Sequence, residues 1–214
     1  MTEKIFWSDP YQMTLNTTVS STIGDCIRLR ETIFYAFSGG QESDTGTIGG
    51  HRVLEASKSG LDIDYRLAED HGLEPDDPVR VEIDWDRRYR LMRLHFAAEL
   101  VLEVVYRQLG EVEKIGAHIA ADKARIDFYW PENIAPRFQE LAAEAQGIID
   151  RNLEIATAFS DEENQMRYWE IEGFARVPCG GTHLKRTGEV GNIALKRKNI
   201  GKGKERIEVY AVAK

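Results

Sequence analysis

The chain has 214 residues, of which 42% are hydrophobic and 30% charged, and this is the composition of a soluble globular protein with one large domain or two small ones. No stretch approaches the roughly 20 apolar residues that a membrane span needs, and two cysteines are too few for a disulfide scaffold. The net charge of −8, from 28 basic and 36 acidic residues, argues against nonspecific coating of nucleic acid. Because the first residues lack the features of a secretory signal, we expect a cytoplasmic protein that does not contact membranes.

The first part of the chain has the pattern of a small β-barrel or sandwich. From residue 14 to about residue 84, short β-branched segments alternate with Gly and Pro turn signals. We expect strands over the ranges 14–23, 26–37, 51–56, 61–67 and 79–83.

A glycine-rich run lies within this β pattern. Gly39 and Gly40 would let the backbone approach a ligand closely, and the amide of Gln41 can both donate and accept hydrogen bonds. From composition alone the run is a turn. It is not a P-loop, because no Gly-Lys-Ser/Thr ending follows it, and no dinucleotide fingerprint occurs elsewhere. We therefore expect no nucleotide cofactor.

The hydrophobic period changes near Asp86, which predicts a long amphipathic helix ending at Gly110. The domain boundary should lie here, giving a first domain of residues 1–84 and an α+β domain of residues 85–214. In the second domain we expect two further helices and several strands. The helices are expected over 136–151 and 161–169, and the strands over 112–119, 125–130, 153–159, 173–177, 190–198 and 206–212.

The sharpest local motif is Cys179-Gly180-Gly181-Thr182-His183. Thiolate and imidazole are the commonest zinc ligands, but four residues of extended strand would separate these two side chains by about 13 Å. A shared metal therefore requires the chain to curl, and the two glycines supply the freedom for it, including positive φ. The alternative is a glycine turn beside a buried cysteine and a surface histidine, and this motif alone does not decide between them.

His95 and Glu99 form a second motif on the predicted long helix. Residues four apart share one helical face, with Cβ atoms about 6 Å apart. Taken alone the two would be an ordinary helix-surface pair. Together with Cys179 and His183 they offer nitrogen, oxygen and sulfur donors, a set that suits zinc better than magnesium or calcium. The sequence therefore predicts one zinc ion held by His95, Glu99, Cys179 and His183.

Basic residues gather in two places despite the acidic total. Residues 185–206 contain eight basic residues against two glutamates, a local charge of +6. A second cluster, Arg87, Arg88, Arg90 and Arg93, precedes His95. Each cluster alone would be a solvated face, but their places beside the two candidate metal motifs favour a polyanionic ligand. We expect phosphate contacts from Arg87, Arg88, Lys196, Arg197, Lys198, Lys202 and Lys204.

These features together resemble the AlaX family, the free-standing relatives of the editing domain of alanyl-tRNA synthetase, which is also similar to the editing domain of threonyl-tRNA synthetase. The resemblance is carried by the ranges 34–46, 88–95, 125–128 and 179–191, which occur in the family's order. It implies the medium-length type, with a small N-terminal β-barrel domain before an α+β editing domain. Two features depart from the family pattern: Glu99 stands where members usually have His, and Ser38 and Glu42 replace a usual Gly and Pro.

The resemblance implies an ATP-independent hydrolase of translation fidelity that removes serine or glycine from mischarged alanine tRNA. A metal-bound water would carry the chemistry, and no catalytic side chain is assigned. We expect Gly39, Gly40, Gln41 and Thr182 to lie at the substrate, where Gln41 or Thr182 would recognise the hydroxyl that distinguishes serine from alanine. The alternatives are a non-catalytic RNA-binding homologue with a structural zinc and a hydrolase of another small acyl ester.

Overall fold

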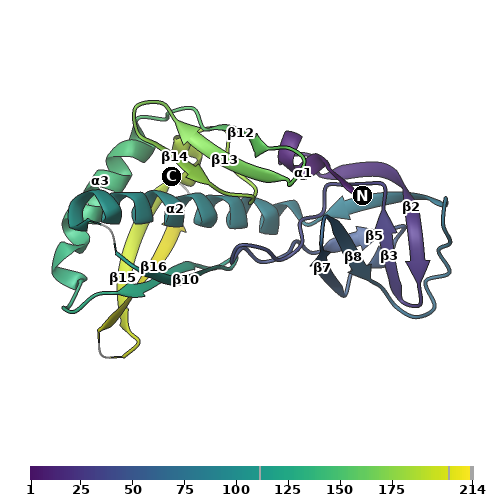
Figure 1. Ribbon diagram of the computed structural model, residues 1–214, viewed down its shortest axis with the longest axis horizontal. Helices are drawn as coiled ribbons and strands as arrows, with labels where there is room; N and C mark the ends of the chain where they lie inside the picture. Colours follow the sequence, from purple (N-terminus) through teal and green to yellow (C-terminus); the bar gives the residue numbers. More distant parts are fainter. Residues whose placement is uncertain (111, 202, 213–214) are drawn as a thin grey trace. The chain divides into compact units, whose positions relative to one another are not determined.

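The computed structural model describes residues 1–110, 112–201 and 203–212 (Figure 1). The chain divides into two compact units. One contains residues 1–38, 42–89 and 163–165, and the other contains residues 39–41, 90–162 and 166–214. Among the described residues, no helix is both long and apolar enough to cross a membrane.

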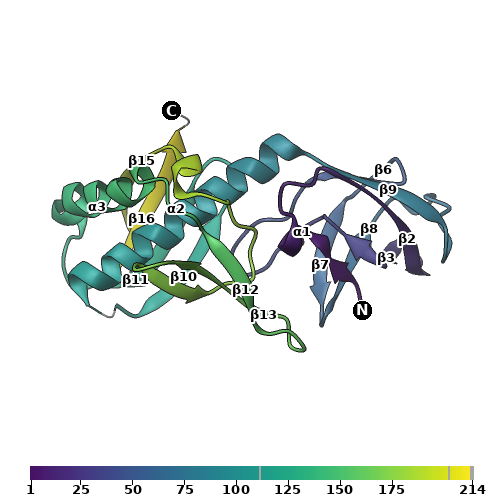
Figure 2. The same ribbon diagram turned by 90° about the horizontal axis from the view of Figure 1, so that it is seen from above.

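A curled sheet of seven strands, a half-barrel, forms most of the first unit (Figure 2). Its strand order is β6-β5-β9-β2-β3-β8-β7, and every neighbouring pair is antiparallel. The predicted fold class, with a small N-terminal β domain, is thus confirmed, and the β domain is a half-barrel. The elements of this part are β1 (Glu3–Lys4), α1 (Ile5–Ser8), β2 (Thr14–Ile23), β3 (Cys26–Leu29), β4 (Glu31–Thr32), β5 (Gly46–Ile48), β6 (His51–Arg52), β7 (Glu55–Ser59), β8 (Asp62–Arg66) and β9 (Pro78–Ile83).

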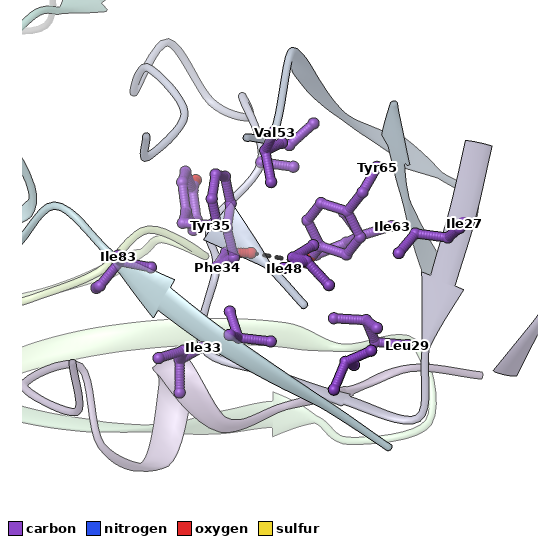
Figure 3. Close-up of a cluster of buried hydrophobic side chains, with 14 of the residues drawn as sticks. Ile27, Leu29, Ile33, Phe34, Tyr35, Ile48, Val53, Ile63, Tyr65 and Ile83 are labelled. Atoms are coloured by element: carbon purple, nitrogen blue, oxygen red, sulfur yellow. Dashed lines mark hydrogen bonds between the residues drawn. The ribbon is translucent and has the colours of Figure 1, made fainter. Parts of the chain in front are cut away.

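The inner face of the half-barrel is filled by large apolar side chains (Figure 3). Leu29, Phe34 and Ile48 are fully buried there. Tyr65 is buried among them, and its hydroxyl group contacts the Thr32 hydroxyl at 2.7 Å and donates to the Phe34 carbonyl at 3.0 Å. Strand alternation, with one apolar residue inward at every second position, therefore produces the core expected from the sequence.

A buried ion pair lies within the first unit, at the start of helix α2 (Trp85–Leu109). The guanidinium of Arg88 is fully buried, pairs with Asp44, and donates to the carbonyl groups of Ile33 at 2.6 Å and Pro10 at 3.0 Å. The Asp44 carboxylate also accepts the backbone N–H of Tyr35 at 2.7 Å. A group enclosed in this way does not reach a phosphate, so the prediction that Arg88 contacts tRNA is wrong.

The second unit contains a four-stranded antiparallel sheet of order β10-β11-β16-β15. Helices α2 and α3 lie beside it (Figure 1), and one of its faces buries Ile126, Ile207 and Val209. The long helix and the closing hairpin predicted from the sequence are both present, as α2 and the β15–β16 pair. The remaining elements here are β10 (Lys114–Ile119), β11 (Ala124–Tyr129), η1 (Ala135–Arg137), α3 (Phe138–Asp150), η2 (Thr187–Val190), β15 (Asn192–Asn199) and β16 (Lys204–Val212).

A smaller sheet corrects one predicted element. Strands β12 (Ala156–Asp161), β13 (Met166–Ile171) and β14 (Ala175–Pro178) pair antiparallel, so the short helix expected over 161–169 is wrong. Burial alternates along β13 at Arg167, Trp169 and Ile171, which is the period of a strand. The turn before β13 places Gln165 at a φ of 55°, a left-handed conformation that does not continue a right-handed helix.

Candidate functional site

Four potential metal ligands converge from two elements of the second unit. His95 and Glu99 lie one turn apart on α2, and Cys179 and His183 lie in the loop that follows β14. One ligand atom from each lies within 4.8 Å of all the others. Nε2 of His95 is 3.5 Å from the Cys179 Sγ and 3.5 Å from a Glu99 oxygen, and Nε2 of His183 is 3.2 Å from the other Glu99 oxygen.

Where the loop curls, Gly181 packs directly against His95. A Cβ atom on Gly181 would be 2.1 Å from Cε1 of His95 and 2.9 Å from the side-chain oxygen of Gln41. A Cβ on Gly180 would have nothing within 4 Å. Neither glycine has a positive φ, so the expectation that they supply left-handed freedom is wrong. Gly181 is needed because there is no room for a side chain, a reason that depends on a residue 86 positions away in the sequence.

A second layer of hydrogen bonds orients the cluster. Nδ1 of His95 is 3.3 Å from the Thr182 carbonyl, an acceptor for an Nδ1–H, and Nε2 faces the cluster. Thr182 in turn makes two bonds with the buried amide of Gln41. The amide N–H donates to the Thr182 hydroxyl at 2.8 Å, and the Gln41 oxygen accepts the Thr182 backbone N–H at 3.2 Å.

The glycine-rich run reaches this layer along the edge of β10. The backbone N–H of Ile119 donates to the Gly40 carbonyl at 2.8 Å, and Gln41 forms a parallel bridge with Ile119. Gly40 has a φ of 87°, and a Cβ there would lie 2.5 Å from the Ala117 carbonyl oxygen. Gly39, at a φ of 60°, faces open space. Gly40 is thus required by close packing against β10, and this packing places Gln41 beside Thr182.

Electrostatic coupling inside the cluster is strong. Burial lowers the pKa of His95, but the Glu99 carboxylate and the Cys179 thiol outweigh it and hold that pKa well above its ordinary value. Burial also lowers the pKa of His183, and the same two groups reverse the effect and raise it. Burial raises the pKa of Glu99, yet the two histidines bring it far below its usual range. Burial and Glu99 raise the Cys179 pKa, but the two histidines lower it by a larger amount, so that the net shift is downward.

The donors fit a zinc ion in both chemistry and spacing. Tetrahedral zinc has bonds of about 2.0 Å to nitrogen or oxygen and about 2.3 Å to sulfur, which puts neighbouring ligand atoms roughly 3.3–3.8 Å apart. Three separations between donor atoms, 3.2–3.5 Å, lie close to this range, and all the donors lie within 4.8 Å of one another. The hydrogen bond from His95 to a carbonyl is the usual support of a zinc-binding imidazole. The cluster could therefore hold one metal ion, with zinc as the best match.

The basic residues predicted to contact tRNA differ in their local surroundings. In the β15–β16 register Arg197 pairs with the buried Ile207, so its side chain projects from the opposite face to Lys196 and Lys198, and it forms an ion pair with Glu205. The Arg197 side chain therefore lies apart from those of Lys196 and Lys198. Lys196 and Lys204 lie over the rings of Tyr210 and Tyr129, at 4.9 Å and 5.5 Å. Arg87 pairs with Glu42 at 2.6 Å, and Lys202 lies outside the described residues.

One buried residue beside the cluster, Arg167, could not be placed there from the sequence pattern. Arg167 lies next to Cys179 across the β13–β14 pair. It falls in the segment for which the pattern predicts a helix, where no partner across a strand can be inferred. No signal in the sequence alone could have placed it at the site.

Comparison with known proteins defines the class. The family described as the threonyl and alanyl tRNA synthetase second additional domain matches residues 167–208, which include Cys179 and His183. The chain is 35% identical over 214 residues to the alanyl-tRNA editing protein AlaX-M of Pyrococcus horikoshii, with 98% of each chain covered. It is 33% identical to the protein of the same name in Methanosarcina mazei, covering 97% of this chain and 95% of that one. The alanine-tRNA ligase of Methanococcus aeolicus is 29% identical over 97% of this chain but only 25% of the ligase. The chain belongs to the AlaX family.

Proposed function

We propose that this protein is a trans-editing enzyme, which hydrolyses the ester that joins serine or glycine to mischarged alanine tRNA. One observation carries the proposal: in a member of the AlaX family, a potential metal cluster lies against a buried Gln41–Thr182 pair. The names of its relatives give alanyl-tRNA editing as their activity. We propose that residues 85–214 carry the metal ligands, that residues 39–41 complete the site through Gln41, and that the rest of residues 1–84 forms an N-terminal domain.

His95, Glu99, Cys179 and His183 would hold one zinc ion. When bound, zinc would polarise the ester carbonyl and make water a better nucleophile at neutral pH. The chain itself orients the ligand side chains. The Thr182 carbonyl fixes the His95 ring, and the N–H of Gly181 donates to the Cys179 Sγ at 3.4 Å, which holds the thiolate. An aminoacyl ester is already activated, so the site needs to position water and ester and little more.

The Gln41–Thr182 pair is proposed to select serine over alanine. The Thr182 hydroxyl accepts from Gln41, so its own proton is available to a substrate oxygen. The second amide N–H of Gln41 offers another donor. A site built to bond a hydroxyl discriminates against the analogue that lacks it far better than an apolar pocket rejects an added group. Gly39 and Gly40 would shape the backbone beside the substrate.

Phosphates of the tRNA are proposed to bind Arg87, Lys196, Lys198, Lys202 and Lys204. Three facts support this assignment: the local charge of +6 over residues 185–206, the shared face of Lys196 and Lys198, and the two lysine ammonium groups that lie over tyrosine rings. Such contacts add affinity without reading base identity.

The test is deacylation by the zinc-loaded protein. Seryl-, glycyl- and alanyl-esters of alanine tRNA are incubated with the protein, and the remaining ester is followed with time. We expect the seryl or glycyl ester to be cleaved much faster than the alanyl ester. Cleavage no faster than in buffer, with zinc bound, would refute the enzymatic proposal.

A second function is favoured by the position of Glu99. Its two oxygens approach the Nε2 atoms of His95 and His183 at 3.5 Å and 3.2 Å, which brings a fourth protein donor to the cluster. A closed site with four protein ligands is the usual pattern of structural zinc. In that case the protein would bind alanine tRNA without hydrolysing its esters, and tight binding with no deacylation would distinguish this function.

A further inference from the structure

Arg167 lies across from Cys179, one step beyond the last residue pair of β13 and β14, although the proposed chemistry does not use it. The N–H of Cys179 donates to the Arg167 carbonyl at 2.8 Å, and the next pair along the strands is Tyr168 with Pro178. Opposed residues of an antiparallel pair project from the same face of a sheet, so the Arg167 and Cys179 side chains share a face. Trp169 projects from that face too, and it packs on Phe96 of α2 with ring centroids 5.1 Å apart. Arg167 is therefore on the face that carries Cys179 and packs on α2.

The Arg167 residue is largely buried and its guanidinium group packs on an aromatic ring. The residue is only 7% exposed. Phe159, its cross-strand neighbour on β12, has its ring centre 4.7 Å from the guanidinium carbon. A guanidinium group carries a positive charge at neutral pH. A positive charge thus belongs to the residue that lies across from Cys179.

The chemistry of this group points to a phosphate. A guanidinium offers parallel N–H donors that match two oxygens of a phosphate group. In an aminoacyl-tRNA the ester is neutral before it reacts, and the nearest full negative charge is the phosphodiester on the 5′ side of the terminal nucleoside. Resting on the proposed function, which brings that ester to the cluster, we propose that Arg167 binds this phosphate and so positions the ester.

Three serine esters test the role of Arg167: seryl-tRNA, the seryl ester of adenosine 5′-monophosphate and the seryl ester of adenosine. For Arg167→Gln we expect kcat/KM to fall roughly 10- to 100-fold on the two esters that carry the phosphate, the loss typical of a charged hydrogen bond. The adenosine ester should change by less than about threefold, since it has no charge for Arg167 to bind. Arg167→Lys keeps the charge without the planar fork and should recover part of the loss.

Arg176→Gln is the matched control. Arg176 is exposed on the adjacent strand β14 and projects from the other face, where its guanidinium carbon is 3.6 Å from the ring centre of Tyr168. Its loss should leave all three rates unchanged. Zinc content and thermal unfolding of both variants establish that the site is intact. With an intact site, an equal loss on all three esters, or a loss on none, would overturn the proposal.

Binding separates this proposal from the proposed hydrolysis. Adenosine 5′-monophosphate and adenosine are titrated into the zinc-loaded wild type and Arg167→Gln by calorimetry. We expect the monophosphate to bind wild type roughly tenfold or more tightly than adenosine does, and this preference to vanish in the variant. If no ester is cleaved and the preference is present, hydrolysis fails and the phosphate site stands. If adenosine 5′-monophosphate and adenosine bind the wild type equally tightly, the phosphate site is overturned, whatever the rates of ester cleavage.

Discussion

Replacing Gly181 with alanine tests the geometry of the candidate metal site with a single methyl group. The added Cβ would lie 2.1 Å from Cε1 and 2.8 Å from Nδ1 of His95, and 2.9 Å from the Gln41 oxygen. These distances are well inside contact distance, and both neighbours are buried, so His95 has to leave its place. Overpacking of this kind costs about 1–3 kcal/mol, or a fall in Tm of roughly 2–10 °C for a chain of this size. Because His95 is a proposed ligand, zinc affinity should fall on the order of 10- to 100-fold as well.

Gly180→Ala is the control for this substitution. Gly180 also has an ordinary φ, but its added Cβ would meet nothing within 4 Å, so helix, loop and cluster should be unaffected. Zinc affinity is measured by competition with a chelator, and Tm by calorimetry with and without zinc. The reasoning is refuted if Gly181→Ala binds zinc and unfolds as the wild type and Gly180→Ala do.

The buried ion pair, the metal cluster and the Gln41–Thr182 pair each give a further expected outcome. Asp44→Asn leaves the buried Arg88 charge without its carboxylate and should lower the free energy of unfolding in urea by about 3–5 kcal/mol. Glu82→Gln, at an exposed pair with Arg80, should lower it by less than about 1 kcal/mol. Similar losses in the two variants would contradict the buried-pair argument. Glu99→Ala should lower zinc content and Glu99→His should retain it, and unchanged zinc content in both variants would show by metal analysis that Glu99 is not a ligand. Gln41→Leu should narrow the ratio of seryl to alanyl cleavage, and an unchanged ratio would exclude Gln41 from selectivity. In the metal-free protein, the raised pKa values of His95 and His183 give stability that is full below pH 6.5 and lost as pH rises through their folded values, while the lowered pKa of Glu99 gives stability that is full above pH 4.5 and lost as pH falls through its folded value. In the presence of chelator, the Tm should therefore fall on the alkaline side. The rise in Tm on adding zinc should grow with pH, because zinc displaces the protons on His95 and His183. A Tm independent of pH would contradict this coupling.

Features that depend on local spacing can be predicted from the sequence. The four-residue step from His95 to Glu99 and the Cys179–His183 run are local patterns, and the structure brings these four residues together. The family resemblance and the fold class are also confirmed. The alternation of faces along a strand is a local pattern as well. Applied to the predicted strand over 190–198, alternation alone places Arg197 on the opposite face to Lys196 and Lys198.

Other features depend on partners distant in the chain and could not be predicted. Nothing near Arg88 in the sequence shows that Asp44 encloses it, so the sequence alone indicates a surface charge. The segment over 161–169 begins with five consecutive polar residues, but pairing with β12 and β14 decides its conformation. The reason for Gly181 is likewise a contact with a distant helix.

The two units of the chain are interleaved in sequence. The backbone passes from one to the other after residues 38, 41, 89, 162 and 165. A fragment that begins at residue 85 would lack residues 39–41, so the Ile119 N–H would lose its acceptor on Gly40 and Thr182 would lose both bonds to Gln41. A fragment of residues 85–214, expressed alone, would therefore be missing one edge of the candidate site. Supplying the 39–41 segment on a separate N-terminal fragment offers a way to restore it, which would make this protein a candidate for assembly from two pieces.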